Sequence, residues 1–424
     1  MMSDFPDIQT TPATPQAGFL INRNFALLFL GRLLSQLGDA VYLFSLSWYI
    51  LVTTGSTAKT GIVMMTSLIA TVIIGPIAGV WIDRINRKTV LISMDAIRML
   101  IVGTMGVLLY FDILPFWLLC TGTGLVGICT SVFNPACSSI LPNLVSKDNL
   151  TKANSLDSIA VNASQVVGAL IGAVLYAWLG IVAIFILNAA SYMISALLQS
   201  GIRYSPTAHK VPGEFMNELK AGFSYLKTKR ALYLVFIYLI GLNFLLAPIL
   251  EVYLPYIVQH LLHGTVAQLS YIRVSFAFGI VIGGAIMSKL PQVELLNRRF
   301  IFSLLLFSIS LFGMLIPVLP KLLDSWSLHQ AIWFYISLTV VTGLFFGFAS
   351  IISNVIFQKD VEDEYRGRIT SLLMTFGSSA MPFGYLIGGV SAASIPMYVL
   401  IATTAGFLLL ITLMMLISKP IKEL

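Results

Sequence analysis

The sequence has very little charge for its length. Only 10% of its 424 residues are Asp, Glu, Lys or Arg, whereas 58% are hydrophobic, and the mean hydropathy is +0.91. Soluble domains carry about 25% charged residues, which cover their surface. So few charges cannot cover a water-soluble surface of this size. The composition excludes a soluble or disordered protein, and we expect the apolar surface to face lipid.

Cysteines and catalytic motifs are scarce as well. Cys120, Cys129 and Cys137 fall inside one apolar segment without zinc-ligand spacing, so we interpret them as small core residues. The sequence has no Gly-x-x-x-x-Gly-Lys-Ser/Thr motif and no His-Glu-x-x-His motif. We therefore expect no metal, no cofactor, no catalytic residue and no enzymatic activity. A membrane-embedded enzyme or sensor is the alternative from a different functional class.

Apolar segments long enough to cross a membrane, which takes about 20 residues, run through the whole chain. They are too uniformly apolar for soluble amphipathic helices and too long for membrane strands. The twelve segments are 24–52, 57–82, 88–110, 113–141, 153–178, 180–202, 231–258, 267–289, 299–320, 328–356, 369–392 and 394–417. The sequence thus predicts an all-α membrane protein with twelve transmembrane helices.

The basic residues gather on one side of this predicted bundle. With a cytoplasmic N-terminus, twenty of the 25 Lys and Arg residues fall on the cytoplasmic side, and only Lys59 and Lys321 fall outside. Cytoplasmic loops of membrane proteins carry such an excess. We expect both termini in the cytoplasm. The net charge of +7 therefore indicates membrane orientation and not a nucleic-acid partner.

The longest polar interruption divides the spans into two sets of six. The predicted units are a disordered tail at 1–22, a bundle at 23–202, a linker at 203–230, a bundle at 231–418 and a tail at 419–424. Within the linker, Phe215, Leu219, Phe223 and Leu226 share one side of a helix. This pattern predicts an amphipathic helix on the inner membrane surface, with a solvated linker as the alternative.

The two halves also repeat each other. Glycine pairs four residues apart recur at matched places, which lets helix backbones approach closely. They are Gly168 and Gly172 in the fifth span, Gly384 and Gly388 in the eleventh, Gly75 and Gly79 in the second, and Gly279 and Gly283 in the eighth. The repetition predicts two pseudo-symmetric six-helix bundles, an architecture of many secondary transporters.

Charge is concentrated in the loop after the second span, which reads Gly79-Val80-Trp81-Ile82-Asp83-Arg84-Ile85-Asn86-Arg87-Lys88. This string resembles the signature loop of the major facilitator superfamily, Gly-x-x-x-Asp-Arg-x-Gly-Arg-Lys/Arg. Asn86 replaces the usual Gly, and Asn tolerates left-handed backbone. We predict a gate whose contacts form in one conformation and break in another. Its residues are Gly79, Asp83, Arg84, Arg87 and Lys88. A stop signal made of basic residues is the alternative.

Further strings narrow the resemblance. Phe133-Asn134-Pro135-Ala136, Ala153-Asn154-Ser155-Leu156 and Arg366-Gly367-Arg368-Ile369 resemble the drug:proton antiporter branch, which contains macrolide-efflux proteins and the enterobactin exporter. The resemblance implies a monomeric exporter of amphiphilic small molecules in the bacterial plasma membrane, in contact with lipids and driven by protons. A dedicated exporter of one siderophore or peptide antibiotic, or a lysolipid flippase, is the alternative on the same fold.

Ionisable residues within the spans are the candidates for coupling. A charge at mid-bilayer costs about 3 kcal/mol, so it faces a cavity or a partner. Asp39 lies in the first span and Glu251 in the seventh, and the family resemblance implies that these spans line a central cavity. We predict that both bind protons or cations. A static ion pair with Arg32, on the same helix face as Asp39, or with Arg273 is the alternative.

Two further sets complete the predicted site. Asp95 and Arg98 are three residues apart in the third span, so they can pair, and we expect them to assist the gate or to lock the bundle. The neutral residues Asn162, Gln165 and Asn243 are predicted to face the cavity, with hydrogen bonds between helices as the alternative.

Overall fold

The computed structural model describes residues 21–82, 85–203, 215–289, 296–322 and 325–418, and over these ranges the chain is helical with short connections and no strand. The first half consists of α1 (Arg23–Thr54), α2 (Thr57–Ile82), α3 (Arg87–Tyr110), α4 (Phe116–Leu144) and α5 (Leu150–Ser200). After α6 (Phe215–Thr228), the second half consists of α7 (Arg230–Pro248), α8 (Leu254–Tyr256), α9 (Val266–Met287), α10 (Leu296–Gly313), α11 (Leu328–Asp360), α12 (Asp363–Ser379), α13 (Met381–Ala392) and α14 (Met397–Ile417).

The prediction of twelve spans is confirmed, although the helix ends divide them differently. Over the described residues, ten helical stretches are long and apolar enough to cross a membrane. One of them, α5, holds the fifth and sixth spans, which meet at Gly180 with φ 73°, a conformation that glycine adopts without strain. The eleventh span is made of α12 and α13, which meet near Ala380.

The seventh span is irregular because proline interrupts it. It runs from α7 through α8, with π-helical turns at Ile249–Tyr253 and Ile257–Leu261. Pro248 precedes the first of these turns, and Pro255 lies between the two. Proline lacks an amide hydrogen and therefore cannot donate the usual helical hydrogen bond. Such wide turns place Glu251 in a locally distorted helix rather than in a regular one.

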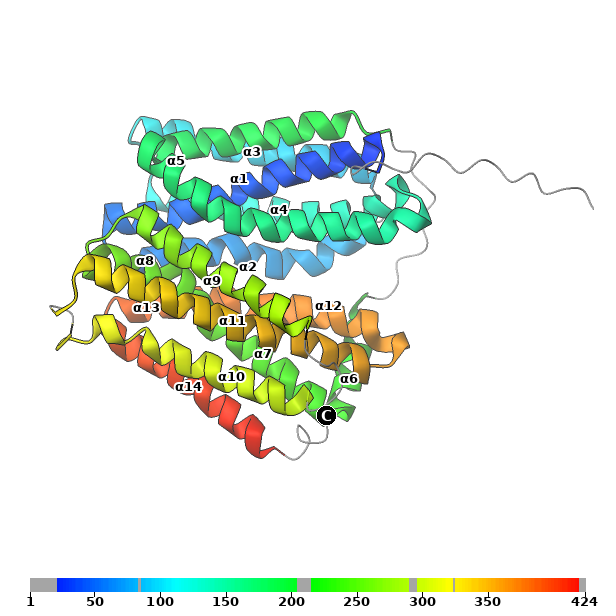
Figure 1. Ribbon diagram of the computed structural model, residues 1–424. Helices are drawn as coiled ribbons and strands as arrows, with labels where there is room; N and C mark the ends of the chain where they lie inside the picture. The colour runs from blue at the N-terminus through cyan, green and yellow to red at the C-terminus, as the bar shows by residue number, and fades with distance from the viewer. Residues whose placement is uncertain (1–20, 83–84, 204–214, 290–295, 323–324, 419–424) are drawn as a thin grey trace, which may run out of the picture.

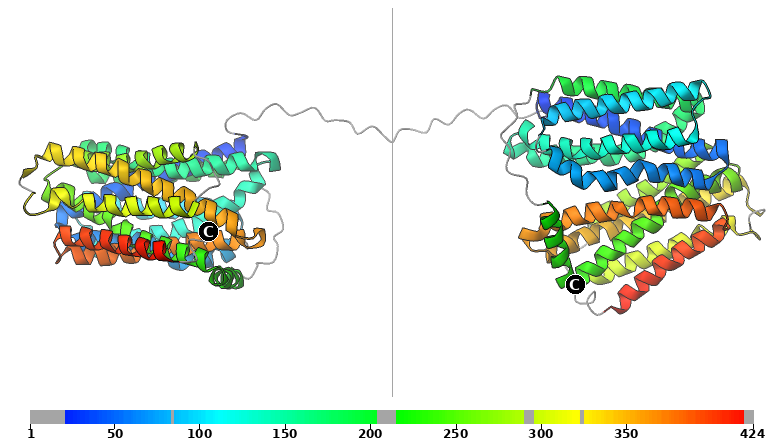
Figure 2. Two further views of the ribbon diagram at one scale, coloured as in Figure 1. Left: turned by 60° about the horizontal axis from the view of Figure 1, so that its bottom comes forward. Right: turned by 180° about the vertical axis from the view of Figure 1, so that it is seen from behind.

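The helices run side by side in two halves (Figure 1). The start of α1 and the end of α14 lie at the same end of the bundle, which we call the terminal end. The opposite end, where α1 passes into α2, is the distal end. The view from behind in Figure 2 (right) shows the same division, with the first half stacked on the second.

The duplication is visible in the helix contacts. In the first half, two glycines of the fifth span face the first span, and in the second half, two glycines of the eleventh span face the seventh. A Cβ added at any of these glycines would lie within 3.1 Å of an atom of the facing span. The contacts pair Gly168 with Ala40 and Gly172 with Phe44 in the first half, and Gly384 with Phe244 and Gly388 with Pro248 in the second. The glycines repeat at an offset of 216 residues, and their partners repeat at 204. The two bundles are therefore pseudo-symmetric at the level of single contacts.

The other predicted glycine faces differ from each other. A Cβ at Gly279 or Gly283 would meet the α11 backbone at Val340 and Leu344, at 2.1 and 2.6 Å, so this pair packs as expected. A Cβ at Gly75 would have no atom within 4 Å. The prediction of a packing face is therefore wrong at Gly75, because no described residue packs against α2 there.

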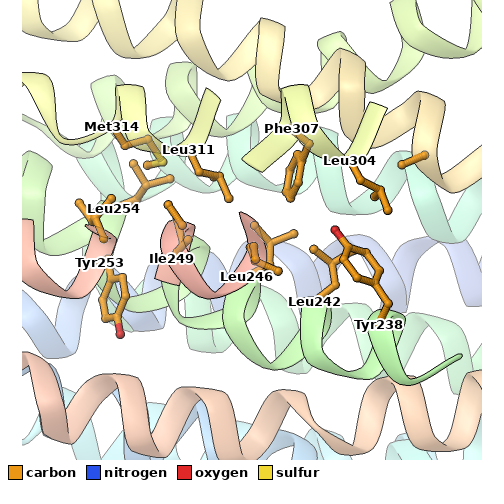
Figure 3. Close-up of a cluster of buried hydrophobic side chains, with 14 of the residues drawn as sticks. Tyr238, Leu242, Leu246, Ile249, Tyr253, Leu254, Leu304, Phe307, Leu311 and Met314 are labelled. Atoms are coloured by element: carbon orange, nitrogen blue, oxygen red, sulfur yellow. The ribbon is translucent and has the colours of Figure 1, made fainter. Parts of the chain in front are cut away.

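The core of the second half forms between α7 and α10. Tyr238, Leu242 and Leu246 of α7 face Leu304 and Phe307 of α10 (Figure 3). These side chains are almost fully buried. Because lipid is as apolar as these side chains, the helix pair is stabilised by close van der Waals packing and not by removal of the side chains from water.

The closest described contacts between the halves lie toward the distal end. Thr57, the first residue of α2, donates a hydrogen bond to the Gly389 carbonyl of α13 at 3.0 Å. One turn along α2, a Cβ at Gly61 would lie 2.3 Å from the Tyr385 carbonyl oxygen. We call this crossing of α2 and α13 the distal seam. At Gly61 and Gly389 it leaves no room for a side chain.

The linker helix α6 lies at the terminal end and packs on the protein (Figure 1). Tyr225 stacks on Tyr365 of α12, with 4.2 Å between ring centroids, and Leu226 is fully buried. The side chains of Phe215 and Leu219 lie outside the described residues. The described part of the apolar face thus differs from the expectation of a membrane-surface helix, because α12 covers it.

Candidate functional site

A polar pocket of about 150 Å³ opens in the first half, between α1, α2, α4 and α5. Its polar lining residues are Gln36, Asp39, Tyr42, Ser67, Thr71, Thr123, Thr130, Asn134 and Gln165. Asp39 is the one charged residue that lines it. Such a pocket can attract a cation while its neutral groups orient hydrogen-bonding parts of a ligand.

Asp39 is held by two groups from neighbouring helices. The Tyr192 hydroxyl on α5 donates a hydrogen bond to its carboxylate, and Arg98 Nη1 on α3 lies 3.6 Å from Asp39 Oδ2. The alternative pairing of Asp39 with Arg32 is wrong. Arg32 Nη1 instead lies 2.8 Å from Asp157 at the terminal end of α5, because that carboxylate faces it across the α1–α5 contact.

Asp95 and Arg98 pair with each other, and both side chains are fully buried. Gln199 Nε2 also donates to Asp95 at 2.9 Å. We expected this pair either to assist the gate at the loop after α2 or to lock the bundle. Its described contacts are with Asp39 on α1 and with Gln199 on α5, so the pair connects three helices.

Glu251 forms the alternative ion pair that the sequence left open. Arg273 Nη2 on α9 lies 2.8 Å from Glu251 Oε2 and also donates to the Leu250 carbonyl. The guanidinium lies over the ring of Phe44 on α1, 5.1 Å from its centroid. Glu251 lines neither of the two pockets described here. Its ion pair therefore joins the halves and does not face the polar pocket.

A second pocket, of about 230 Å³, lies in the second half between α7, α10, α11 and α12. Asn243, Ser350, Ser353 and Asn354 supply its polar groups, and the rest of the lining is apolar and rich in phenylalanine. Among the lining residues that the structure describes, none is charged. This pocket suits an uncharged, aromatic or apolar ligand group.

The three neutral candidates differ in position. Gln165 lines the polar pocket and Asn243 lines the apolar one. Asn162 lines neither, and its amide donates to the Ser158 carbonyl one turn earlier at 2.8 Å. Asn243 makes the equivalent local bond to Leu239 at 3.0 Å.

The predicted gate is described only in part. Asp83 and Arg84 lie outside the described residues, and Gly79 lies within α2. Arg87 begins α3 and donates to the Ser139 carbonyl of α4 at 2.9 Å. Asn86 has φ −63°, so its backbone is not left-handed, and the turn does not depend on the tolerance of Asn for that conformation.

Asn86 instead acts as the N-cap of α3. Its side-chain oxygen accepts a hydrogen bond from the amide of Lys88, the next gate residue, at 3.0 Å. Asn is among the preferred residues at this position. The departure from the family pattern therefore preserves the start of α3 by capping it.

Sequence reasoning missed the sixth span as part of the site. Asn188, Tyr192, Ser195 and Gln199 are buried and face the ion pairs of α1 and α3. Their spacing of four, three and four residues puts them on one helix face. This polar stripe in an apolar span was the available signal.

The described residues contain no group of three or more His, Cys, Asp and Glu that could hold a metal ion. Cys129 and Cys137 are buried and Cys120 is half-buried, each as a free thiol. The functional groups of the site are thus carboxylates, a guanidinium, hydroxyls and amides. They can bind protons, cations and hydrogen-bonding ligands.

Comparisons with known proteins agree with this geometry. The family model described as Major Facilitator Superfamily matches residues 28–385. Macrolide efflux protein A of Streptococcus pyogenes is 24% identical over 371 residues, which cover 87% of this chain and 89% of that protein. The staphyloferrin A transporter of Staphylococcus aureus is 25% identical over 373 residues, which cover 86% and 87%.

A similar solved structure is that of a bacterial homologue of the iron transporter ferroportin in an inward-facing state. It has a TM-score of 0.70 at 17% identity and covers 92% of this chain and 97% of its own. At this identity the likeness concerns the fold alone. It supports the two-bundle arrangement derived above.

Proposed function

Because the chain belongs to the major facilitator superfamily, we propose that it is a proton-coupled exporter of amphiphilic small molecules that works by alternating access. Members of this family and the relatives named above are multi-pass membrane transporters. The observation that supports coupling is Asp39, the single charged group among the described lining residues of the two pockets. A cation and a proton would compete for its carboxylate.

Competition at one carboxylate is sufficient for antiport. Ionised Asp39 attracts a cationic ligand into the polar pocket, and protonation removes that attraction. If the protein changes conformation only with one of the two bound, proton entry drives ligand exit. The apolar pocket around Asn243 would hold the uncharged part of the ligand.

The distal seam and the charged loop are the proposed gates of this cycle. Opening the seam between α2 and α13 requires loss of the Thr57–Gly389 hydrogen bond. It also separates Arg273, paired with Glu251, from Phe44. At the terminal end, the loop from Gly79 to Lys88, with Asp83 and Arg84, would close as the seam opens. The site would thus face one side at a time.

We place the protein in the bacterial plasma membrane as a monomer, with the terminal end in the cytoplasm. The excess of basic residues at that end supports this orientation. The seam then closes the outer side, so the described conformation would be the one open to the cytoplasm. This is the side from which an exporter loads its substrate.

Transport by reconstituted protein tests the proposal. Proteoliposomes with an imposed pH gradient would be supplied with ethidium or erythromycin, and Asp39→Asn should abolish gradient-driven transport while leaving downhill exchange. Asp112→Asn is the matched control, because Asp112 is an exposed acid at the distal end of α3. Unchanged pH-driven transport by Asp39→Asn would refute coupling at this residue.

A dedicated exporter of one metabolite is the second candidate. The relative named staphyloferrin A transporter favours it, because that protein is similar over 86% of this chain. Transport of a single compound from a panel of dyes, macrolides and siderophores would support the dedicated exporter. Transport of several unrelated cations would support the broader one.

A further inference from the structure

A buried ionic cluster connects Asp39 to two groups that the proposed coupling reaction does not yet use. The cluster consists of Asp39 on α1, Asp95 and Arg98 on α3, and Tyr192 on α5. Arg98 donates to Asp95 and lies 3.6 Å from Asp39. One guanidinium therefore serves two carboxylates.

The charges of this cluster do not balance. Two carboxylates and one guanidinium leave one negative charge when all are ionised, in the middle of the bundle, where an uncompensated charge is costly. The other groups that face the cluster are neutral or self-paired. They are Tyr42 on α1, Ser67 and Thr71 on α2, Cys129, Thr130 and Cys137 on α4, Asn188, Ser195 and Gln199 on α5, and the more distant pair Arg32–Asp157. A single added proton neutralises the cluster.

The two carboxylates differ in access to that proton. The Asp95 side chain is 0% exposed, and it accepts hydrogen bonds from Arg98 and Gln199. The Asp39 side chain is 16% exposed and lines the polar pocket. The exchanging proton therefore reaches Asp39, and Asp95 stays ionised beside Arg98.

The guanidinium of Arg98 is held so that it can turn between them. It lies between the rings of Phe133 and Tyr192, 4.3 and 4.5 Å from their centroids. Among the described residues its buried Nε has no hydrogen-bond partner. Its two terminal nitrogens face different carboxylates: Nη2 donates to Asp95, and Nη1 lies 3.6 Å from Asp39 and donates to the Thr130 hydroxyl at 3.5 Å.

We propose that Arg98 and Asp95 are positioning residues that set the pH at which Asp39 releases its proton. When the O–H bond of the Asp39 carboxyl breaks, the proton passes to water in the pocket, and Arg98 turns toward the new carboxylate. Asp95 opposes this movement by retaining Arg98. The inference rests on the proposed coupling at Asp39, and it adds a competition between two acids for one arginine.

Infrared difference spectroscopy of the full-length protein during a pH titration tests this without a ligand. The C=O stretch of a protonated carboxyl group reports Asp39, and Asp39→Asn identifies the band by removing it. Asp95→Asn should shift the midpoint to lower pH by about 1–3 units, because Arg98 then serves Asp39 alone. Arg98→Gln should shift it to higher pH by a similar amount.

Controls separate positioning from general damage. Asp112→Asn changes an exposed acid at the distal end of α3 and should leave the midpoint unchanged. Arg98→Lys keeps a cation and should move the midpoint back from that of Arg98→Gln, which also covers the case in which Arg98→Gln does not fold. Opposite shifts for Asp95→Asn and Arg98→Gln are not expected from a merely structural role.

Several outcomes would overturn the inference. Asp95→Asn and the Arg98 variants could leave the midpoint unchanged or shift it in the same direction, or Asp39→Asn could leave the titrating band in place. The proposed function fails by a different measurement, namely pH-driven transport that survives Asp39→Asn. If pH-driven transport depended on Asp39 but Asp95→Asn did not shift the infrared midpoint, the proposed function would stand and the positioning role would be refuted.

Discussion

The distal seam makes a quantitative prediction about conformational balance. In Gly61→Ala, the new Cβ would lie 2.3 Å from the Tyr385 carbonyl oxygen and 3.0 Å from Gly389 Cα, whereas ordinary contacts are 3.4–4 Å. The backbones of α2 and α13 must therefore separate by about 1 Å. Overpacking of this kind costs about 1–3 kcal/mol. The cost falls only on conformations in which the seam is closed.

Gly75→Ala is the matched control within the same helix. A Cβ there meets no atom within 4 Å, so the variant gains only the helix preference of alanine, about 1 kcal/mol, which Gly61→Ala gains as well. The difference between the two variants isolates the seam. Relative to Gly75→Ala, Gly61→Ala should shift the population toward the state that is open at the distal end by about 5- to 150-fold.

Labelling from the distal side measures this shift. A cysteine at Gln165, which lines the polar pocket, would be placed in a background in which Cys120, Cys129 and Cys137 are replaced by alanine. An impermeant maleimide should label it from the distal side faster in Gly61→Ala than in Gly75→Ala. Equal labelling of both variants would refute the role of the seam as a closed gate.

Three further predictions concern packing and ion pairs. Asp157→Asn leaves Arg32 without its carboxylate, so we expect a lower Tm, with a loss of about 1–3 kcal/mol after allowance for the partial exposure of Asp157. The double variant Arg32→Leu/Asp157→Leu should recover most of the lost stability, because no buried charge is then left without a partner. Gly279→Ala should have a lower Tm than the wild type when thermal unfolding is measured, because its Cβ would lie 2.1 Å from the α11 backbone. Gly406→Ala, with no atom within 4 Å, should not. Tyr225→Ala removes the ring stacked on α12 and the hydrogen bond that the Glu362 amide donates to Tyr225 Oη at 3.2 Å, so it should speed hydrogen exchange in α6. Tyr225→Phe loses only the hydrogen bond and keeps the stack, worth about 0.5–1.5 kcal/mol, so exchange should be slower than in Tyr225→Ala.

Much of the fold could be predicted from the sequence because its signals are local. Apolar length gave the spans, and even the break near 178–180 was visible and corresponds to Gly180. The glycine pairs at Gly168 and Gly384 indicated the duplication, because close helix contact leaves a trace at each position. Such features depend on each helix and its nearest neighbour.

The partners of the intramembrane charges could not be predicted in the same way. Arg32 and Asp39 share a helix face, yet they pair with different helices, Arg32 with α5 and Asp39 with α3. Helix rotation and tilt decide such choices, and neither is fixed by the length of an apolar segment. For the same reason Tyr192 entered the site only when its distance to α1 was known.

The duplication explains why the two pockets differ in character. The offset of 204 residues that relates Ala40 to Phe244 also relates Asp39 to Asn243. Equivalent positions on the first and seventh spans thus carry an acid in one half and its neutral counterpart in the other. The acid faces a polar pocket backed by Arg98, and the amide faces an apolar pocket. A ligand bound between them would meet charge on one side and apolar surface on the other, which is the polarity of an amphiphile. The asymmetry also confines protonation at this pair of positions to the first half, so the second half can act as an apolar wall whose affinity is independent of pH.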